Sequence, residues 1–143
     1  MAEAYVLVVD DEKEFLESVA ERLQNRDMGV DTAQNGAQAL EKIGANSYDA
    51  IVLDLMMPEL DGMETLKQAL LKKPDLQIIL LTGHASVHHG VEAMREGALD
   101  FMEKPADLDA LVEKIKEGKS RRLQIDAQTR ERAVREALTK YSW

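Results

Sequence analysis

Several apolar runs of this sequence are followed closely by polar side chains whose chemistry fits together. These side chains belong to Asp10, Asp11, Asp54, Thr82 and Lys104. Three carboxylates at one place repel one another unless a cation lies among them, and their oxygens are ligands that suit Mg²⁺. A metal ion and a lysine can neutralise a phosphoryl group in transfer, and a carboxylate can be the nucleophile. The set therefore points to Mg²⁺-dependent phosphoryl transfer, with Asp54 as the acceptor.

The apolar runs that precede these side chains have the character of buried strands. The first spans Ala4 to Val9, another spans Ala50 to Leu53 and a third spans Gln77 to Leu81. Continuous rather than alternating apolarity is typical of parallel strands that helices cover on both faces. Two weaker runs, Val30 to Ala33 and Ala98 to Met102, bring the predicted sheet to five strands.

Apolar residues at helical spacing predict one helix after each strand. The predicted helices contain Phe15 to Leu23, Ala37 to Ile43, Met63 to Leu70, Val87 to Glu96 and Leu108 to Lys116. This alternation, (βα)5, predicts an open, doubly wound, five-stranded parallel α/β sheet, because helical crossovers between parallel strands are right-handed. Ligands of such sheets bind at the carboxyl ends of the strands, which is where the polar side chains fall.

Each polar side chain also has a purely structural explanation. Asp10 or Asp11 can cap a helix, and Lys104 can be a solvated charge. The recurrence of polar residues at the end of one strand after another favours a shared site over separate roles. Asp54 is the predicted nucleophile because it ends the central strand, whereas Asp10 and Asp11 lie on a loop suited to hold the ion.

Composition limits the classes of protein that remain. The chain has 143 residues, 45% hydrophobic and 31% charged, which fits one globular domain. Its formal net charge of −9 argues against direct binding of nucleic acid or an anionic membrane. The absence of cysteine excludes thiol catalysis and Cys-ligated metals. No apolar run approaches the ~20 residues of a membrane span and no signal peptide is recognisable, so we expect a cytoplasmic protein.

The balance of charge changes sign near Gly118. Residues 1–119 hold 12 basic and 24 acidic residues, whereas residues 120–143 hold 6 and 3. We therefore expect one domain over residues 1–118 and a basic helical tail or linker over residues 119–143. The apolar residues of the tail recur loosely at helical spacing and are Leu123, Ala127, Val134, Leu138 and Tyr141. So narrow a stripe needs a partner, either the chain's own acidic domain or, as we favour, a second copy in a homodimer.

Four ordered motifs carry a resemblance to a known family. They are VLVVDDE at 6–12, IVLDLMMPELDG at 51–62, LLTGHAS at 80–86 and DFMEKP at 100–105. Together they strongly resemble the receiver domain of bacterial two-component response regulators, over about residues 4–116. The resemblance implies a flavodoxin-like receiver fold and a phosphorelay function. Asp54 would accept a phosphoryl group from a cognate histidine kinase or phosphotransfer protein and signal to a downstream protein target or output domain.

The resemblance also implies roles for single residues. Mg²⁺ would be held by Asp10, Asp11, Asp54 and the backbone carbonyl of Met56. Thr82 and Lys104 would bind the acyl phosphate, and Phe101 would be the aromatic switch residue. The peptide bond between Lys104 and Pro105 would be cis.

Met56 bears on two further predictions. In this family the positions of Met56 and His84 flank the path of the water that hydrolyses the phosphoryl group, so both residues would tune its lifetime. A phosphohydrolase with an aspartyl nucleophile is the enzyme alternative, but it needs a second acid at the position of Met56. We therefore expect a signalling switch rather than an enzyme.

A transcription factor would need an output domain after the receiver domain. Only 38 residues follow Pro105, too few for a DNA-binding domain after a fifth helix. The chain is thus expected to act by protein contact alone, or to be a receiver fragment of a longer transcriptional regulator or hybrid histidine kinase.

Overall fold

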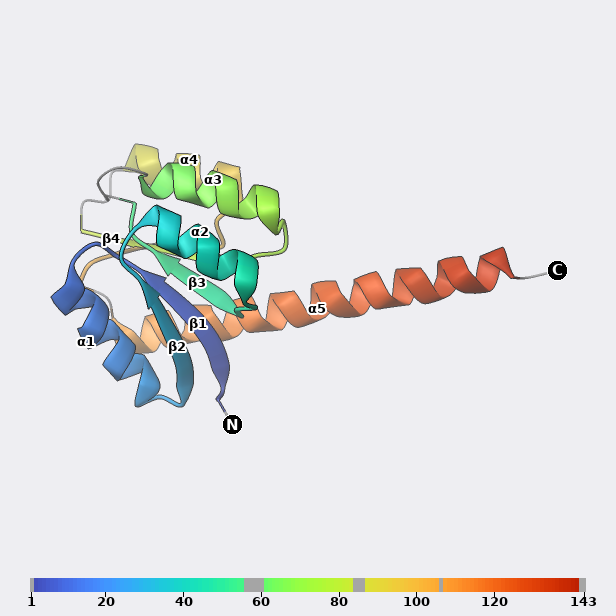
Figure 1. Cartoon of the computed structure of the whole chain (residues 1–143), viewed down its shortest axis with the longest axis horizontal. Coiled ribbons are helices and arrows are strands. Elements are labelled where there is room, and N and C mark those ends of the chain that lie inside the picture. The colour runs from blue at the N-terminus through green and yellow to red at the C-terminus, as the bar shows by residue number, and fades with distance from the viewer. Residues whose placement is uncertain (1, 56–60, 84–86, 106, 142–143) are drawn as a thin grey trace.

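A computed structural model describes residues 2–55, 61–83, 87–105 and 107–141 of the chain. Over these residues, strands and helices alternate along the sequence (Figure 1). The strands are β1 (Ala4–Val9), β2 (Met28–Ala33), β3 (Ala50–Leu53), β4 (Ile78–Thr82) and β5 (Asp100–Glu103). The helices are α1 (Lys13–Gln24), α2 (Gly36–Ala45), α3 (Gly62–Lys72), α4 (Val87–Glu96) and α5 (Leu108–Lys140).

All neighbouring strands are parallel, and their order in the sheet is β2-β1-β3-β4-β5. β1 therefore lies between β2 and β3, and the direction in which strands are added reverses after β2. This is the order of the flavodoxin-like doubly wound fold, in which ligands bind at the reversal, outside the carboxyl ends of β1 and β3. The predicted (βα)5 architecture is confirmed.

Helices cover both faces of the sheet (Figure 1). One core includes Leu40 of α2, Leu66 of α3 and Ala93 of α4. The core on the opposite face includes Leu23 of α1 and Ile115 of α5. Because successive side chains of a strand point to opposite faces, every residue of β3 and β4 is buried, and all of them except Thr82 belong to one core or the other. This burial explains the continuous apolar runs.

β5 begins two residues later than the sequence predicts. Gly97 has a left-handed φ of 113°, and the N–H of Ala98 donates to the carbonyl of Ala93 in α4 at 3.1 Å. Ala98 therefore belongs to the C-terminal cap of the helix and cannot start the strand. Pairing with β4 begins at Asp100, which lies opposite Ile79.

α5 continues without a break far beyond the predicted end at Lys116 (Figure 1). Gly118 lies inside the helix, where its missing side chain permits a close approach to the domain. A Cβ there would lie 3.1 Å from Cβ of Gln77 and 3.4 Å from the carbonyl oxygen of Asp49. Residues 127–140 are all exposed, and this part of the helix extends away from the sheet.

Candidate functional site

The ends of β1 and β3 bring two carboxylates to one edge of the sheet. Asp10 directly follows β1, and its N–H donates to the carbonyl of Ala33 at 3.1 Å. Asp54 directly follows β3, and its N–H donates to the carbonyl of Val9 at 3.0 Å. These hydrogen bonds extend the sheet by one residue beyond each strand. The backbone of the sheet therefore holds the side chains of Asp10 and Asp54 in place.

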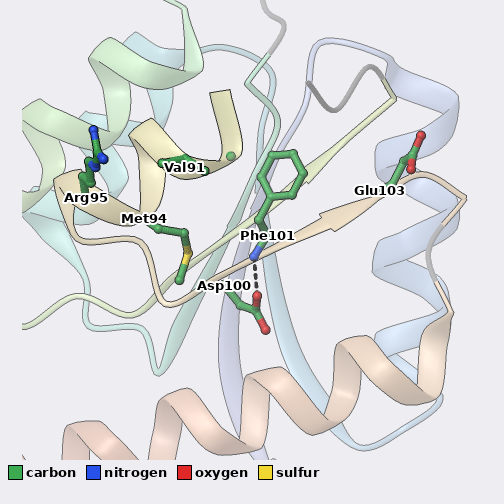
Figure 2. Close-up of a pocket in the computed structure, with 7 residues that line it drawn as sticks. Val91, Met94, Arg95, Asp100, Phe101 and Glu103 are labelled. Atoms are coloured by element: carbon green, nitrogen blue, oxygen red, sulfur yellow. Dashed lines mark hydrogen bonds between the residues drawn. The ribbon is translucent and has the colours of Figure 1, made fainter. Parts of the chain in front are cut away.

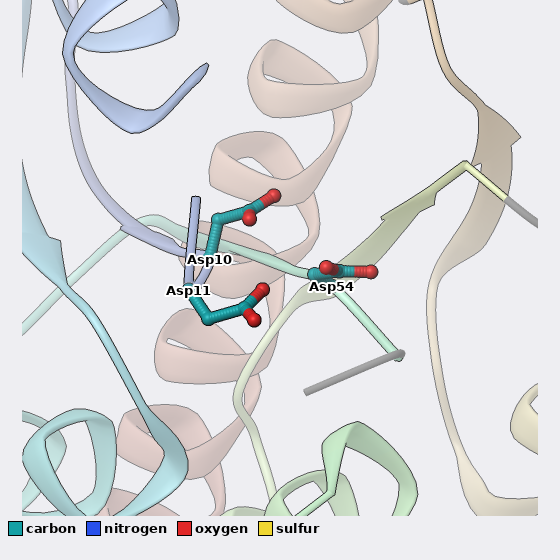
Figure 3. A group of neighbouring side chains, drawn as sticks. All are labelled: Asp10, Asp11 and Asp54. Carbon is teal, nitrogen blue, oxygen red and sulfur yellow. The ribbon is translucent and has the colours of Figure 1, made fainter. Parts of the chain in front are cut away.

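Asp10, Asp11 and Asp54 form one acidic group (Figure 3). One carboxylate oxygen of each residue lies within 4.8 Å of the others. Asp10 is 1% and Asp54 is 4% exposed, whereas Asp11 is exposed. Two unit charges about 4 Å apart repel by roughly 4 kcal/mol at an effective dielectric constant of 20, so the group demands positive charge. Hard oxygen donors with one side open to water fit a small divalent cation such as Mg²⁺.

Lys104 brings a fixed positive charge to this group. Its Nζ lies 2.6 Å from Oδ2 of Asp10 and 3.7 Å from Oδ2 of Asp54. Its backbone N–H donates to the carbonyl of Thr82 at 2.9 Å, and its peptide bond to Pro105 is cis. Burial lowers the pKa of Lys104, but the hydrogen bond to Asp10 and the charges of Asp10 and Asp54 outweigh burial and raise it. The lysine is therefore cationic at neutral pH.

The hydroxyl of Thr82 is fully buried at the end of β4, next to β3. Among the buried side-chain polar atoms of the residues that the structure describes, Oγ1 of Thr82 stands alone in having no hydrogen-bond partner. An unsatisfied buried polar group costs about 1–3 kcal/mol. A ligand with acceptor oxygens that enters this edge of the sheet can recover that free energy.

Phe101 lies on β5, at the side of the sheet that α4 covers. Its ring packs on the core and contacts α4 so closely that a Cβ at Gly90 would lie 3.4 Å from two ring atoms. Beside the ring, α4 and β5 line a hollow of about 660 Å³ (Figure 2). Val91 and Met94 project from α4 into this region and are 45% and 44% exposed. The predicted switch residue thus borders an exposed apolar surface.

Two residues of the predicted site are not among those that the structure describes. Met56, with its backbone carbonyl, and His84 are outside the described residues.

The sequence motifs gave no role to Phe15, which was predicted only as part of the apolar face of a helix. Its ring centroid lies 4.0 Å from Nζ of Lys104. No signal in the sequence indicated this contact, because Phe15 and Lys104 belong to distant segments that meet only in the folded chain.

The family model for the response regulator receiver domain matches residues 6–116 of the chain. The chain belongs to the response regulator receiver domain family. The transcriptional regulatory protein ZraR of Klebsiella oxytoca is 39% identical over 106 residues, which are 74% of this chain and 24% of ZraR. The response regulator MprA of Mycobacterium sp. (strain KMS) is 40% identical over 111 residues, which are 78% of this chain and 48% of MprA. The chain thus spans a quarter to a half of these curated relatives.

Solved structures share the fold. A response regulator receiver domain protein from Clostridium thermocellum superposes with a TM-score of 0.81 and 31% identity, covering 85% of this chain and 98% of that one. NtrX from Brucella abortus superposes with a TM-score of 0.81 and 30% identity, covering 90% of this chain but 30% of NtrX. The likeness to NtrX therefore concerns one part of a longer protein.

Proposed function

We propose that this chain is a phosphorelay switch in which Asp54 accepts a phosphoryl group from a phosphohistidine of a histidine kinase or phosphotransfer protein. The observation that carries the proposal is the hydroxyl of Thr82, which is buried at the end of β4 and has no hydrogen-bond partner among the described residues. A phosphoryl group on Asp54 would bring acceptor oxygens to this hydroxyl and to the ammonium of Lys104. In this proposal the protein is a signalling switch, and the only reactions that it undergoes are its own phosphorylation and dephosphorylation.

In the proposed transfer, a carboxylate oxygen of Asp54 attacks the phosphorus atom. A P–O bond to Asp54 forms while the P–N bond of phosphohistidine breaks, and the imidazole leaves with the bonding electron pair. Mg²⁺, held by the acidic group and the carbonyl of Met56, would supply further neutralisation of the phosphoryl oxygens. Lys104 is held 2.6 Å from Asp10 and 3.7 Å from Asp54, so its charge is in place before a donor arrives.

The proposed output surface consists of α4, β5 and the part of α5 that packs on the sheet. Phe101 pairs with Leu80, which lies two residues before Thr82 and on the same face of the sheet, so a hydroxyl drawn toward the phosphoryl group would change the space beside the ring. The ring borders the hollow lined by Val91 and Met94, where a downstream protein could read its position. Beryllofluoride, a phosphoryl mimic, should shift amide signals on this surface.

We propose that residues 1–118 form the receiver domain and that residues 119–143 are a basic helical tail or linker. The exposed part of α5 would lead to an output domain of a longer regulator or pair with a second copy of the chain. Among the described residues, none of the helices qualifies as a membrane span. We propose that the protein works in the cytoplasm, where histidine kinases present their phosphohistidine.

Labelling with acetyl phosphate and Mg²⁺ tests the proposed acceptor. The intact mass of the wild-type protein should rise by one phosphoryl group, and chelation of Mg²⁺ should prevent the rise. Asp54→Asn should not label, whereas Asp75→Asn, which changes an exposed carboxylate outside the site, should label like the wild type. Labelling of Asp54→Asn to the wild-type extent would overturn the proposal.

A further inference from the structure

The ammonium of Lys104 lies over an aromatic ring as well as beside carboxylates. Its Nζ is 4.0 Å from the centroid of the Phe15 ring, and the lysine side chain is only 14% exposed. Phe15 belongs to the first turn of α1, and its ring is half-buried against the core between α1, α5 and the sheet. The negative face of a ring attracts a cation at this distance, and more strongly when the cation is withdrawn from water.

Asp10 fixes both members of this contact. Its Oδ1 accepts a hydrogen bond from the N–H of Glu12 at 2.9 Å, and its Oδ2 pairs with Nζ of Lys104 at 2.6 Å. The N–H of Leu16 donates to the carbonyl of Glu12 at 2.9 Å, which sets the start of α1. One carboxylate therefore positions the first turn of α1, and Phe15 with it, relative to the lysine.

We propose that Phe15 is a positioning residue for Lys104. The ring face limits the orientations of a flexible four-carbon side chain and keeps the ammonium where it meets a phosphoryl group on Asp54. This inference rests on the proposed function, which gives the lysine its role in binding phosphate. A leucine at position 15 retains most of the apolar packing but has no ring face, whereas a tyrosine retains both.

Nuclear magnetic resonance tests the contact without any phosphoryl transfer. The ring current of Phe15 should move the ε-methylene proton signals of Lys104 upfield, and Lys104→Arg assigns these signals by removing them. Phe15→Leu should return these signals to the ordinary chemical shift of a lysine ε-methylene group, and Phe15→Tyr should keep them upfield. Identical signals in the wild type and in Phe15→Leu would overturn the inference.

Labelling kinetics test the positioning role. With acetyl phosphate and Mg²⁺, Phe15→Leu should lower the second-order rate constant of labelling roughly threefold to tenfold, and Phe15→Tyr should stay within about twofold. In a Lys104→Met background, Phe15→Leu should have no further effect, because the residue through which it acts is gone. An equal loss in both backgrounds would show that Phe15 acts through packing alone and would overturn the inference.

The outcomes separate this inference from the proposed function. If Asp54→Asn still labels, the proposed function fails, whereas the ring-current measurement still reports on the contact. If Asp54→Asn abolishes labelling and Phe15→Leu labels at the wild-type rate, the function stands and the positioning role fails. Urea unfolding of each Phe15 variant verifies that the rates are measured on folded protein.

Discussion

The carboxylate of Asp49 lies 3.3 Å from the guanidinium of Arg122, at the edge of the sheet opposite the candidate site. The same carboxylate accepts the N–H of Tyr5 at 2.8 Å, and its side chain is only 13% exposed. Lys119, on the same stretch of α5, also donates to the carbonyl of Glu3. These contacts tie the helix to the domain just where its exposed part begins, so the domain sets the direction in which α5 leaves.

Arg122→Gln should loosen this connection. Amide hydrogen exchange over residues 119–126 should become several-fold faster, because Asp49 no longer anchors that turn of the helix. The matched control is Arg135→Gln, since Arg135 pairs with Glu131 at 2.6 Å within the exposed part of α5. Unchanged exchange over residues 119–126 in Arg122→Gln would show that the ion pair does not hold the helix.

Gly62, the first residue of α3, lies against the backbone that carries the acceptor. A Cβ there would be 2.3 Å from the carbonyl oxygen of Asp54 and 2.3 Å from Cα of Leu55. Its φ is not left-handed, so close packing rather than conformation requires glycine. Gly62→Ala should lower the free energy of unfolding by about 2 kcal/mol or more, measured in urea, because backbone must move to admit the methyl group.

Gly44→Ala is the control for that substitution. Gly44 is exposed in α2, and the nearest atom to a Cβ there would be Nζ of Lys72 at 3.8 Å. Alanine should raise the free energy of unfolding by roughly 0.5–1 kcal/mol, because it favours helix over the unfolded chain. A Gly62→Ala protein as stable as the wild type would contradict the packing argument.

The positions of Asp10 and Asp54 could be predicted because parallel strands buried on both faces leave continuous apolar runs. The first polar residue after such a run marks the carboxyl end of the strand. Once the order of strands and helices is known, the sheet places these ends at one edge, and the acidic group follows. The structure was needed to show that the hydroxyl of Thr82 is buried without a hydrogen-bond partner among the described residues.

Features that depend on packing between distant segments could not be predicted. Glycine is a weak helix former, so Gly118 suggests from sequence that the helix ends there. Its close approach to Gln77 shows why a glycine lies inside α5. The contact between Phe15 and Lys104 joins the first helix to the end of the last strand. Neither spacing nor composition carries such information, because the two residues meet only after the sheet has formed.

Asp11 should contribute more to Mg²⁺ binding than Asp10. The carboxylate of Asp10 already accepts the N–H of Glu12 and pairs with Lys104, whereas Asp11 is exposed at the open side of the acidic group. Asp11→Ala should therefore weaken Mg²⁺ affinity by about tenfold or more, and Asp10→Ala by a smaller factor. Equal losses of Mg²⁺ affinity in Asp11→Ala and Asp10→Ala, measured by calorimetric titration, would contradict this prediction.

Asp100 on β5 should make stability depend on pH in the acid range. Burial raises its pKa, but hydrogen bonds from Lys114 and from the N–H of Phe101 outweigh burial and hold the pKa below its ordinary value of 3.8. A lowered pKa stabilises the fold above the unfolded value, and the contribution disappears as pH falls through the folded value. Asp100→Asn should be less stable than the wild type near pH 7, with a difference that narrows below about pH 4. If urea unfolding gives the same difference in the free energy of unfolding between the wild type and Asp100→Asn at every pH, this prediction is contradicted.

The chemical position of the phosphoryl group distinguishes Asp54 from the other candidate acceptors. Borohydride reduces an acyl phosphate to an alcohol, so homoserine replaces the phosphorylated aspartate and tandem mass spectrometry locates it. After labelling with acetyl phosphate and Mg²⁺, homoserine should appear at position 54, and none should appear when Mg²⁺ is chelated. Homoserine at position 10 or 11, or phosphate retained on Thr82 after reduction, would contradict the assignment of Asp54 as the acceptor.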